Sequence, residues 1–133
     1  MKIMIILAVI AAAVMAFVQL SHVRIGQKHD IPAVAEDTTT AGGFTAVRPL
    51  TAAANDVIAR IEKVAQETPR TTKLSDDPLR FVTRSRFMGF ADVTTIAVRD
   101  EHLVIHAHLT VGASDLGVNK ARVVNWLDRL GPL

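Results

Sequence analysis

The chain contains no cysteine and carries little net charge, and each of these absences excludes a class of function. Without cysteine, its 133 residues cannot form a disulfide, a thiolate nucleophile or a cysteine-ligated metal site. A formal net charge of +2 is too small to indicate nucleic-acid binding. The sequence also has no nucleophile-elbow motif and no phosphate-cradling glycine loop. These absences favour a binding or structural role over catalysis, and no catalytic residue, cofactor or metal site is predicted.

Polar residues are also missing from the start of the chain. Ile3 to Val18 is an unbroken apolar run, and a helix needs roughly 20 mainly apolar residues to span a bilayer. Continuing the run through the next few residues gives that length, so residues 1–23 are predicted to form a transmembrane anchor. The alternative is a cleaved signal peptide, with Lys2 as its charged start and cleavage near residues 14–16.

Basic residues flank both ends of this run, so the positive-inside rule is nearly balanced. Lys2 precedes the run, whereas Arg24 and Lys28 follow it. A short N-terminal tail before the span and a folded domain after it favour export of the C-terminal part. The predicted location is therefore the inner membrane, crossed once, with the C-terminal domain in the periplasm.

The next segment, residues 24–47, shows neither helical nor alternating periodicity. It contains acidic residues, a proline, three consecutive threonines and Gly42-Gly43. Such a stretch cannot bury enough apolar area to offset the entropy lost on ordering. It is predicted to be a flexible tether, and residues 48–133 are predicted to form one domain.

The domain shows two helical patterns and four extended ones. Apolar residues recur at helical spacing from Ala52 to Glu67, with Thr51 as the N-cap, and again from Leu116 to Leu130. This order predicts an α+β fold, a two-layer sandwich in which an antiparallel sheet of about four strands carries two helices on one face. The extended segments are Arg70–Leu74, Leu79–Phe87, Val93–Arg99 and His102–Val111.

Alternation along these strands predicts which side chains point away from the helices. In the last strand, His106 and His108 alternate with apolar residues that we expect in the core. Arg84 and Arg86 alternate similarly in the second strand, and arginines cannot lie unpaired in a core that helices cover. The predicted binding site is therefore a cationic patch on the open sheet face, made of Arg84, Arg86, His106 and His108.

Two stretches together resemble the uncharacterised DUF1499 family, small bacterial and plastid domains often preceded by a membrane segment. They comprise Thr68–Thr71, Val82–Arg86 and Gly89–Asp92 in the first stretch, and Gly112–Val123 and Trp126-Leu127 in the second. The resemblance covers residues 43–130 and implies no reaction. Many members carry a cysteine ahead of the first helix and arginines on the strand before the glycine–serine–aspartate motif. This chain has no cysteine, and His108 and Thr110 stand at the aligned strand positions.

The run that begins at Gly112 precedes the last helix. Ser114 or Asp115 can accept hydrogen bonds from the first free amides of that helix, and Gly117 permits close approach of another segment. The alternative is an anion site at the helix N-terminus, which the Asp115 carboxylate opposes by occupying the same donors. We therefore interpret Gly112, Ser114, Asp115, Gly117 and Asn119 as a structural helix-cap motif.

Three functions stay open from the sequence. The first, which we prefer, is a membrane-tethered accessory or binding domain whose cationic face engages a protein partner or anionic lipid headgroups. The second is a hydrolase or metal-dependent enzyme that uses His106 and His108, although a metal site would need a third ligand such as His102. The third is a structural subunit of a membrane complex, which would show an apolar patch beyond the anchor.

Overall fold

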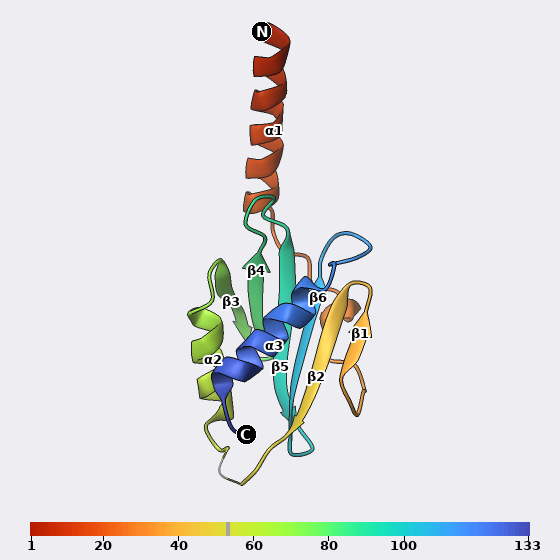
Figure 1. Ribbon diagram of the computed structural model, residues 1–133, viewed down its shortest axis with the longest axis vertical. Helices are drawn as coiled ribbons and strands as arrows, with labels where there is room; N and C mark the ends of the chain where they lie inside the picture. Colours follow the sequence, from red (N-terminus) through yellow and green to blue (C-terminus); the bar gives the residue numbers. More distant parts are fainter. Residues whose placement is uncertain (53) are drawn as a thin grey trace.

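The computed structural model describes residues 1–52 and 54–133 of the chain (Figure 1). Its first element is helix α1 (Lys2–Leu20), which projects from one end of an α+β domain. The apolar window of α1 is 0% buried, and the helix is long and apolar enough to cross a membrane. These features are also those of an N-terminal signal sequence.

Six antiparallel strands form one sheet in the part of the chain that the structure describes, in the order β1-β2-β6-β5-β4-β3. The predicted α+β class is confirmed, but the sheet has six strands rather than about four. The strands are β1 (Thr38–Thr40), β2 (Gly43–Pro49), β3 (Thr71–Asp76), β4 (Leu79–Arg84), β5 (Ala91–Arg99) and β6 (His102–Leu109).

The two unexpected strands, β1 and most of β2, lie in the segment predicted to be a flexible tether. β2 pairs with β6 along its whole length, and its first four residues, Gly43 to Ala46, are all buried. Gly43 is required there because a Cβ would lie 2.4 Å from the carbonyl oxygen of Ala107. A strand buried on both faces has no exposed side with which to alternate, so residues 43–46 lack the pattern by which a strand is predicted.

Helices α2 (Val57–Gln66) and α3 (Val118–Leu130) share one hydrophobic core with the sheet. Trp126 of α3 is fully buried, and its ring meets the ring of Phe81 of β4 edge to face, with centroids 6.1 Å apart. Helix α3 crosses β2 and β6, whereas α2 lies against β3 (Figure 1). The residues that α2 buries recur at helical spacing and are Val57, Ile61, Val64 and Ala65.

Both helices begin later than predicted. The first begins at Val57, so Thr51 is not its N-cap, and Ala53, which belongs to the predicted segment, lies outside the described residues. The second begins at Val118 rather than at Leu116, whose φ of 54° is incompatible with a right-handed helix.

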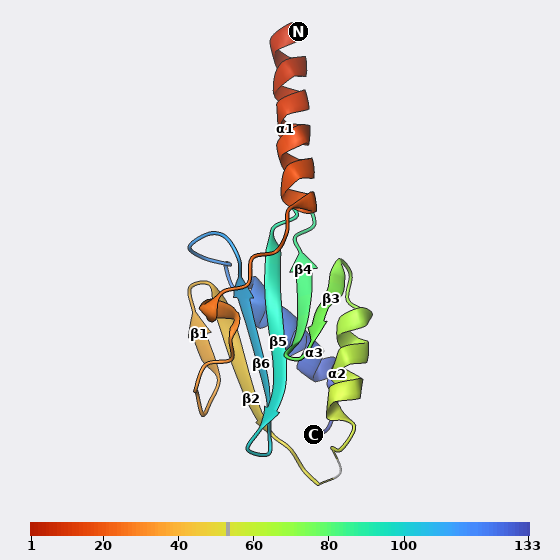
Figure 2. The same cartoon turned by 180° about the vertical axis from the view of Figure 1, so that it is seen from behind.

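The face of the sheet turned away from the helices is partly covered by the chain between α1 and β1 (Figure 2). This chain includes a short 3₁₀ helix, η1 (Gln27–His29), which packs on β5 and β6. His29 and Ile31 are buried on either side of Asp30. We call residues 26–31 the strap, and because of it the face that the sequence predicts to be open is partly closed.

Candidate functional site

His106 lies under the strap, where only 7% of the residue is exposed. Its Nε2 donates to the carbonyl oxygen of Lys28 at 2.7 Å, and its Nδ1 accepts from the hydroxyl of Thr45 at 2.7 Å. Burial lowers the pKa of His106 despite the hydrogen bond to Lys28. Since both ring nitrogens are in use, His106 has none free for a metal ion or a substrate.

A third imidazole, which sequence reasoning missed, belongs to the strap itself. His29 is fully buried; its Nε2 donates to the carbonyl oxygen of Leu109 at 3.1 Å, and its Nδ1 accepts from the amide of Gly26 at 3.0 Å. Burial lowers the pKa of His29. The ring centroid of His108 lies 6.0 Å from those of both His29 and His106. Among residues 1–52 and 54–133, no group of three potential ligands could hold a metal ion.

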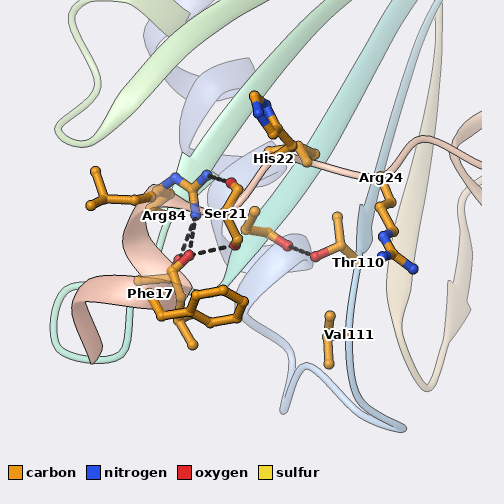
Figure 3. Close-up of a pocket in the computed structure, with 12 residues that line it drawn as sticks. Phe17, Ser21, His22, Arg24, Arg84, Thr110 and Val111 are labelled. Carbon is orange, nitrogen blue, oxygen red and sulfur yellow. Dashed lines mark hydrogen bonds between the residues drawn. The ribbon is translucent and has the colours of Figure 1, made fainter. Parts of the chain in front are cut away.

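The two predicted arginines serve different parts of the structure. Arg84 is half-buried and binds the end of α1, because its guanidinium donates to the carbonyl oxygens of Val18 at 3.1 Å and Ser21 at 2.8 Å (Figure 3). It also donates to the carbonyl oxygen of Gly89 at 3.0 Å. This contact places a positive charge at the negative end of the helix. Arg86, by contrast, is exposed in the loop between β4 and β5.

The structure therefore does not bring the four predicted residues into one open patch. His106 and His108 are neighbours on the sheet, Arg84 is bonded to the end of α1, and Arg86 lies on the loop beyond it. Carbonyl oxygens of the strap and of the end of α1 accept hydrogen bonds from His106 and Arg84. Beside Arg84, at this end of the sheet, lies a groove that is large enough to hold a ligand.

This groove, which we call the junction groove, lies where α1 meets the sheet and has a volume of about 620 Å³ (Figure 3). One wall is the last turn of α1 together with the residues that follow it. The other wall is formed at the ends of β4, β5 and β6. Its apolar lining consists of Phe17, Val18, Leu20, Val23, Ala91 and Val111.

Positive charge accompanies these apolar walls. Arg84 lines the junction groove from the sheet, and the exposed Arg24 lines it from the segment after α1. No acidic residue is among the described residues that line it. Such a lining suits a ligand that is apolar over most of its length and negatively charged at one end. Sequence reasoning missed the groove because its two walls come from segments that a tether was expected to separate.

The predicted helix-cap motif covers the loop before α3 and extends to Asn119 in its first turn. The predicted close approach at Gly117 is wrong, because nothing lies within 4 Å of its Cβ position, and its φ of 80° is what favours glycine there. The Asp115 carboxylate accepts hydrogen bonds from the amides of Asn119 at 2.9 Å and Gly117 at 3.0 Å. Burial raises the pKa of Asp115, but these hydrogen bonds outweigh burial, and the net effect lowers the pKa. The Ser114 hydroxyl oxygen accepts from the amide of Leu116 at 3.2 Å. The protein itself therefore occupies donors that an anion would need at this helix end.

A family model described as "Protein of unknown function (DUF1499)" matches residues 28–130. The match includes all six strands, α2 and α3, and it leaves α1 outside. It confirms the family resemblance seen in the sequence. No curated protein and no solved structure matches the chain.

Proposed function

Because the chain belongs to the DUF1499 family, whose function is unknown, we propose its function from the geometry of the junction groove. It is a membrane-tethered binding domain that takes up an anionic amphiphile with the chemistry of a phospholipid. In this proposal α1 is a single-pass anchor in the inner membrane, and the domain lies in the periplasm. The observation that carries the proposal is the position of the groove at the last turn of α1.

The length of α1 sets the height of the groove relative to a bilayer. Its 19 residues rise about 28 Å at roughly 1.5 Å per residue, close to the hydrocarbon thickness of about 30 Å. When α1 spans a bilayer, its last turn lies at the boundary between acyl chains and headgroups. Phe17 and Leu20 belong to that turn and line the groove. A lipid molecule can therefore enter the groove sideways, without passing through water.

The charges of the groove favour a phosphate-bearing headgroup. The hydrogen bonds of Arg84 go to neutral carbonyl groups, so its positive charge is not cancelled by them. Arg24 adds a second, exposed guanidinium to the same lining. Arginine binds phosphate through paired hydrogen bonds. The enzyme hypothesis needs His106 and His108 together, and both ring nitrogens of His106 are engaged. We therefore retain the binding hypothesis.

Photocrosslinking with the full-length chain in vesicles tests the proposal. The probe is a phosphatidylglycerol analogue with a photoreactive group on its acyl chain, and we expect it to label peptides that line the junction groove. Val111→Trp places a large side chain in the groove and should lower labelling severalfold. Val111 is 69% exposed, so the substitution leaves the core intact. Val98→Trp is the matched control, because Val98 is 45% exposed near the opposite end of β5.

A separate variant tests whether the groove selects anionic headgroups. Arg24→Glu should lower labelling by the anionic analogue more than labelling by a phosphatidylcholine analogue, because only the anionic headgroup carries a net charge. Equal labelling of the natural chain, Val111→Trp and Val98→Trp would contradict binding in the groove. Equal loss with both analogues in Arg24→Glu would contradict headgroup selection by charge.

A further inference from the structure

The loop between β4 and β5 exposes three large apolar side chains at the end of the sheet from which α1 leaves (Figure 1). Phe87 is 73% exposed, Phe90 is 44% exposed and Met88 is 42% exposed. The guanidinium carbon of Arg86 lies 5.4 Å from the centroid of the Phe87 ring. We call residues 85–90 the β4–β5 tip. Apolar side chains gathered on one exposed loop, with arginine beside them, are typical of an interaction surface.

Contacts with α1 fix the position of this tip. A Cβ on Gly89 would lie 2.3 Å from Cγ of Gln19, so the backbone of the tip touches the last turn of α1. Gly89 also has a φ of 71°, which other residues rarely adopt. The guanidinium of Arg84 donates to carbonyl oxygens of both Val18 and Gly89. The tip is therefore held at the level of Gln19 and cannot withdraw from a bilayer that α1 spans.

The opposite end of the sheet has a different chemical character. The α1 end combines the apolar tip with the exposed guanidinium groups of Arg24 and Arg86. An anionic leaflet attracts basic side chains near its surface and repels carboxylates. The β3–β4 and β5–β6 turns lie away from α1 (Figure 1), and their exposed acidic residues are Asp76, Asp77, Asp100 and Glu101.

We infer that the β4–β5 tip is a membrane-docking surface for the bilayer that holds α1. Phe87 and Met88 enter the boundary between headgroups and acyl chains, and Arg86 pairs with lipid phosphate. This inference shares with the proposed function the premise that α1 spans a bilayer, but it does not need an occupied junction groove. A second contact beside α1 fixes the tilt of the domain and keeps the mouth of the groove against lipid.

The absence of cysteine from the chain allows a direct test, because a single introduced cysteine carries a fluorophore without background labelling. Phe87→Cys, Met88→Cys, Val98→Cys and Val9→Cys are each labelled with an environment-sensitive dye. The full-length variants are reconstituted in vesicles of phosphatidylethanolamine and phosphatidylglycerol. Nitroxide-bearing lipids then quench the dye, with the nitroxide either near the headgroup or deep in the acyl region.

We expect the shallow nitroxide to quench the labels at residues 87 and 88 severalfold more than the label at residue 98, and the deep nitroxide to quench the label at residue 9. If the label at residue 9 is quenched but the labels at residues 87 and 88 are quenched no more than the label at residue 98, the docking inference is overturned and the proposed function is not. An unquenched label at residue 9 would place α1 outside the bilayer and overturn both proposals. Quenching at the tip without lipid crosslinking in the groove would overturn only the proposed function.

Discussion

Two adjacent threonines of β5 lie on opposite faces of the sheet and differ in the hydrogen bonds of their hydroxyl groups. Thr94 lies opposite Phe81 on the helix-covered face, and its hydroxyl is buried without a hydrogen bond to any described residue. Thr95 faces the strap, where its hydroxyl donates to the carbonyl oxygen of His29 at 2.7 Å and accepts from Nε of Arg80 at 3.1 Å. A buried hydroxyl stabilises a fold only when such partners satisfy it.

Replacing each threonine by valine should therefore have opposite effects. Thr94→Val removes an unsatisfied hydroxyl and should raise the free energy of unfolding by about 1 kcal/mol. Thr95→Val leaves a carbonyl oxygen and a guanidinium without their partner, and should lower the free energy of unfolding by about 1–2 kcal/mol. Chemical denaturation of the full-length chain in detergent measures both changes. Destabilisation by both variants to the same extent would contradict the assignment.

Arg84 and Arg86 allow a second comparison, in which the same positive charge is removed from a half-buried position and from an exposed one. Arg84→Ala removes three hydrogen bonds to carbonyl oxygens and should destabilise the contact between α1 and the β4–β5 tip by about 1–3 kcal/mol. Amide hydrogen exchange at residues 18–22 and 85–90 should accelerate accordingly. Arg86→Ala, on the exposed loop, should change stability by less than about 0.5 kcal/mol. Identical exchange in the two variants would show that Arg84 does not hold this contact.

The elements of the fold divide into those with a local sequence signal and those without one. Alternation predicts β6 and places Leu103 and Ile105 in the core, where the structure has them. The strap gives no such signal, because His29 is ordered by Leu109, which lies 80 residues along the chain. The junction groove could not be predicted for the same reason, because contacts between residues far apart in the sequence, such as Arg84 with Ser21, bring its two walls together.

Two neutral imidazoles, those of His29 and His106, are among the groups that bind the strap to the sheet, and they make this contact sensitive to acid. Burial lowers the pKa of His29 and of His106 below the value of the unfolded chain. As the pH falls, the unfolded state therefore takes up protons before the folded state does, and stability is lost. The charged or titratable groups that influence the two rings are Lys28, Asp30, Arg80 and His108.

The free energy of unfolding should fall as the pH decreases below about 6.5, the ordinary pKa of histidine, until the lowered pKa values of the folded state are passed. His106→Gln keeps a donor for the Lys28 carbonyl oxygen and an acceptor for Thr45, but it does not titrate. The variant should therefore lose less stability between about pH 7.5 and about pH 5.5 than the natural chain. Urea titrations at the two pH values measure the difference. An equal loss in both proteins would exclude His106 as a cause of acid sensitivity.

The whole molecule has a chemical polarity that follows its long axis. Helix α1, the junction groove and the β4–β5 tip lie at one end, and exposed carboxylates lie on turns at the other (Figure 1). Contacts of α1 with Arg84 of β4 and with Gly89 hold this helix against the domain, whereas the sequence predicted a flexible tether between the two. Any tilt of the helix is therefore transmitted to the sheet.

In the function that we propose, the short connection between α1 and the domain limits where a ligand can be recognised. Only residues 21–26 separate α1 from η1, and a stretch of this length reaches at most about 20 Å when fully extended. With α1 in a bilayer, the domain therefore stays close to the lipid surface. The phospholipid that we propose as ligand of the junction groove would then arrive by diffusing laterally within the leaflet. The encounter rate would depend on how densely the ligand populates that two-dimensional surface, and hardly on its concentration in the surrounding solvent.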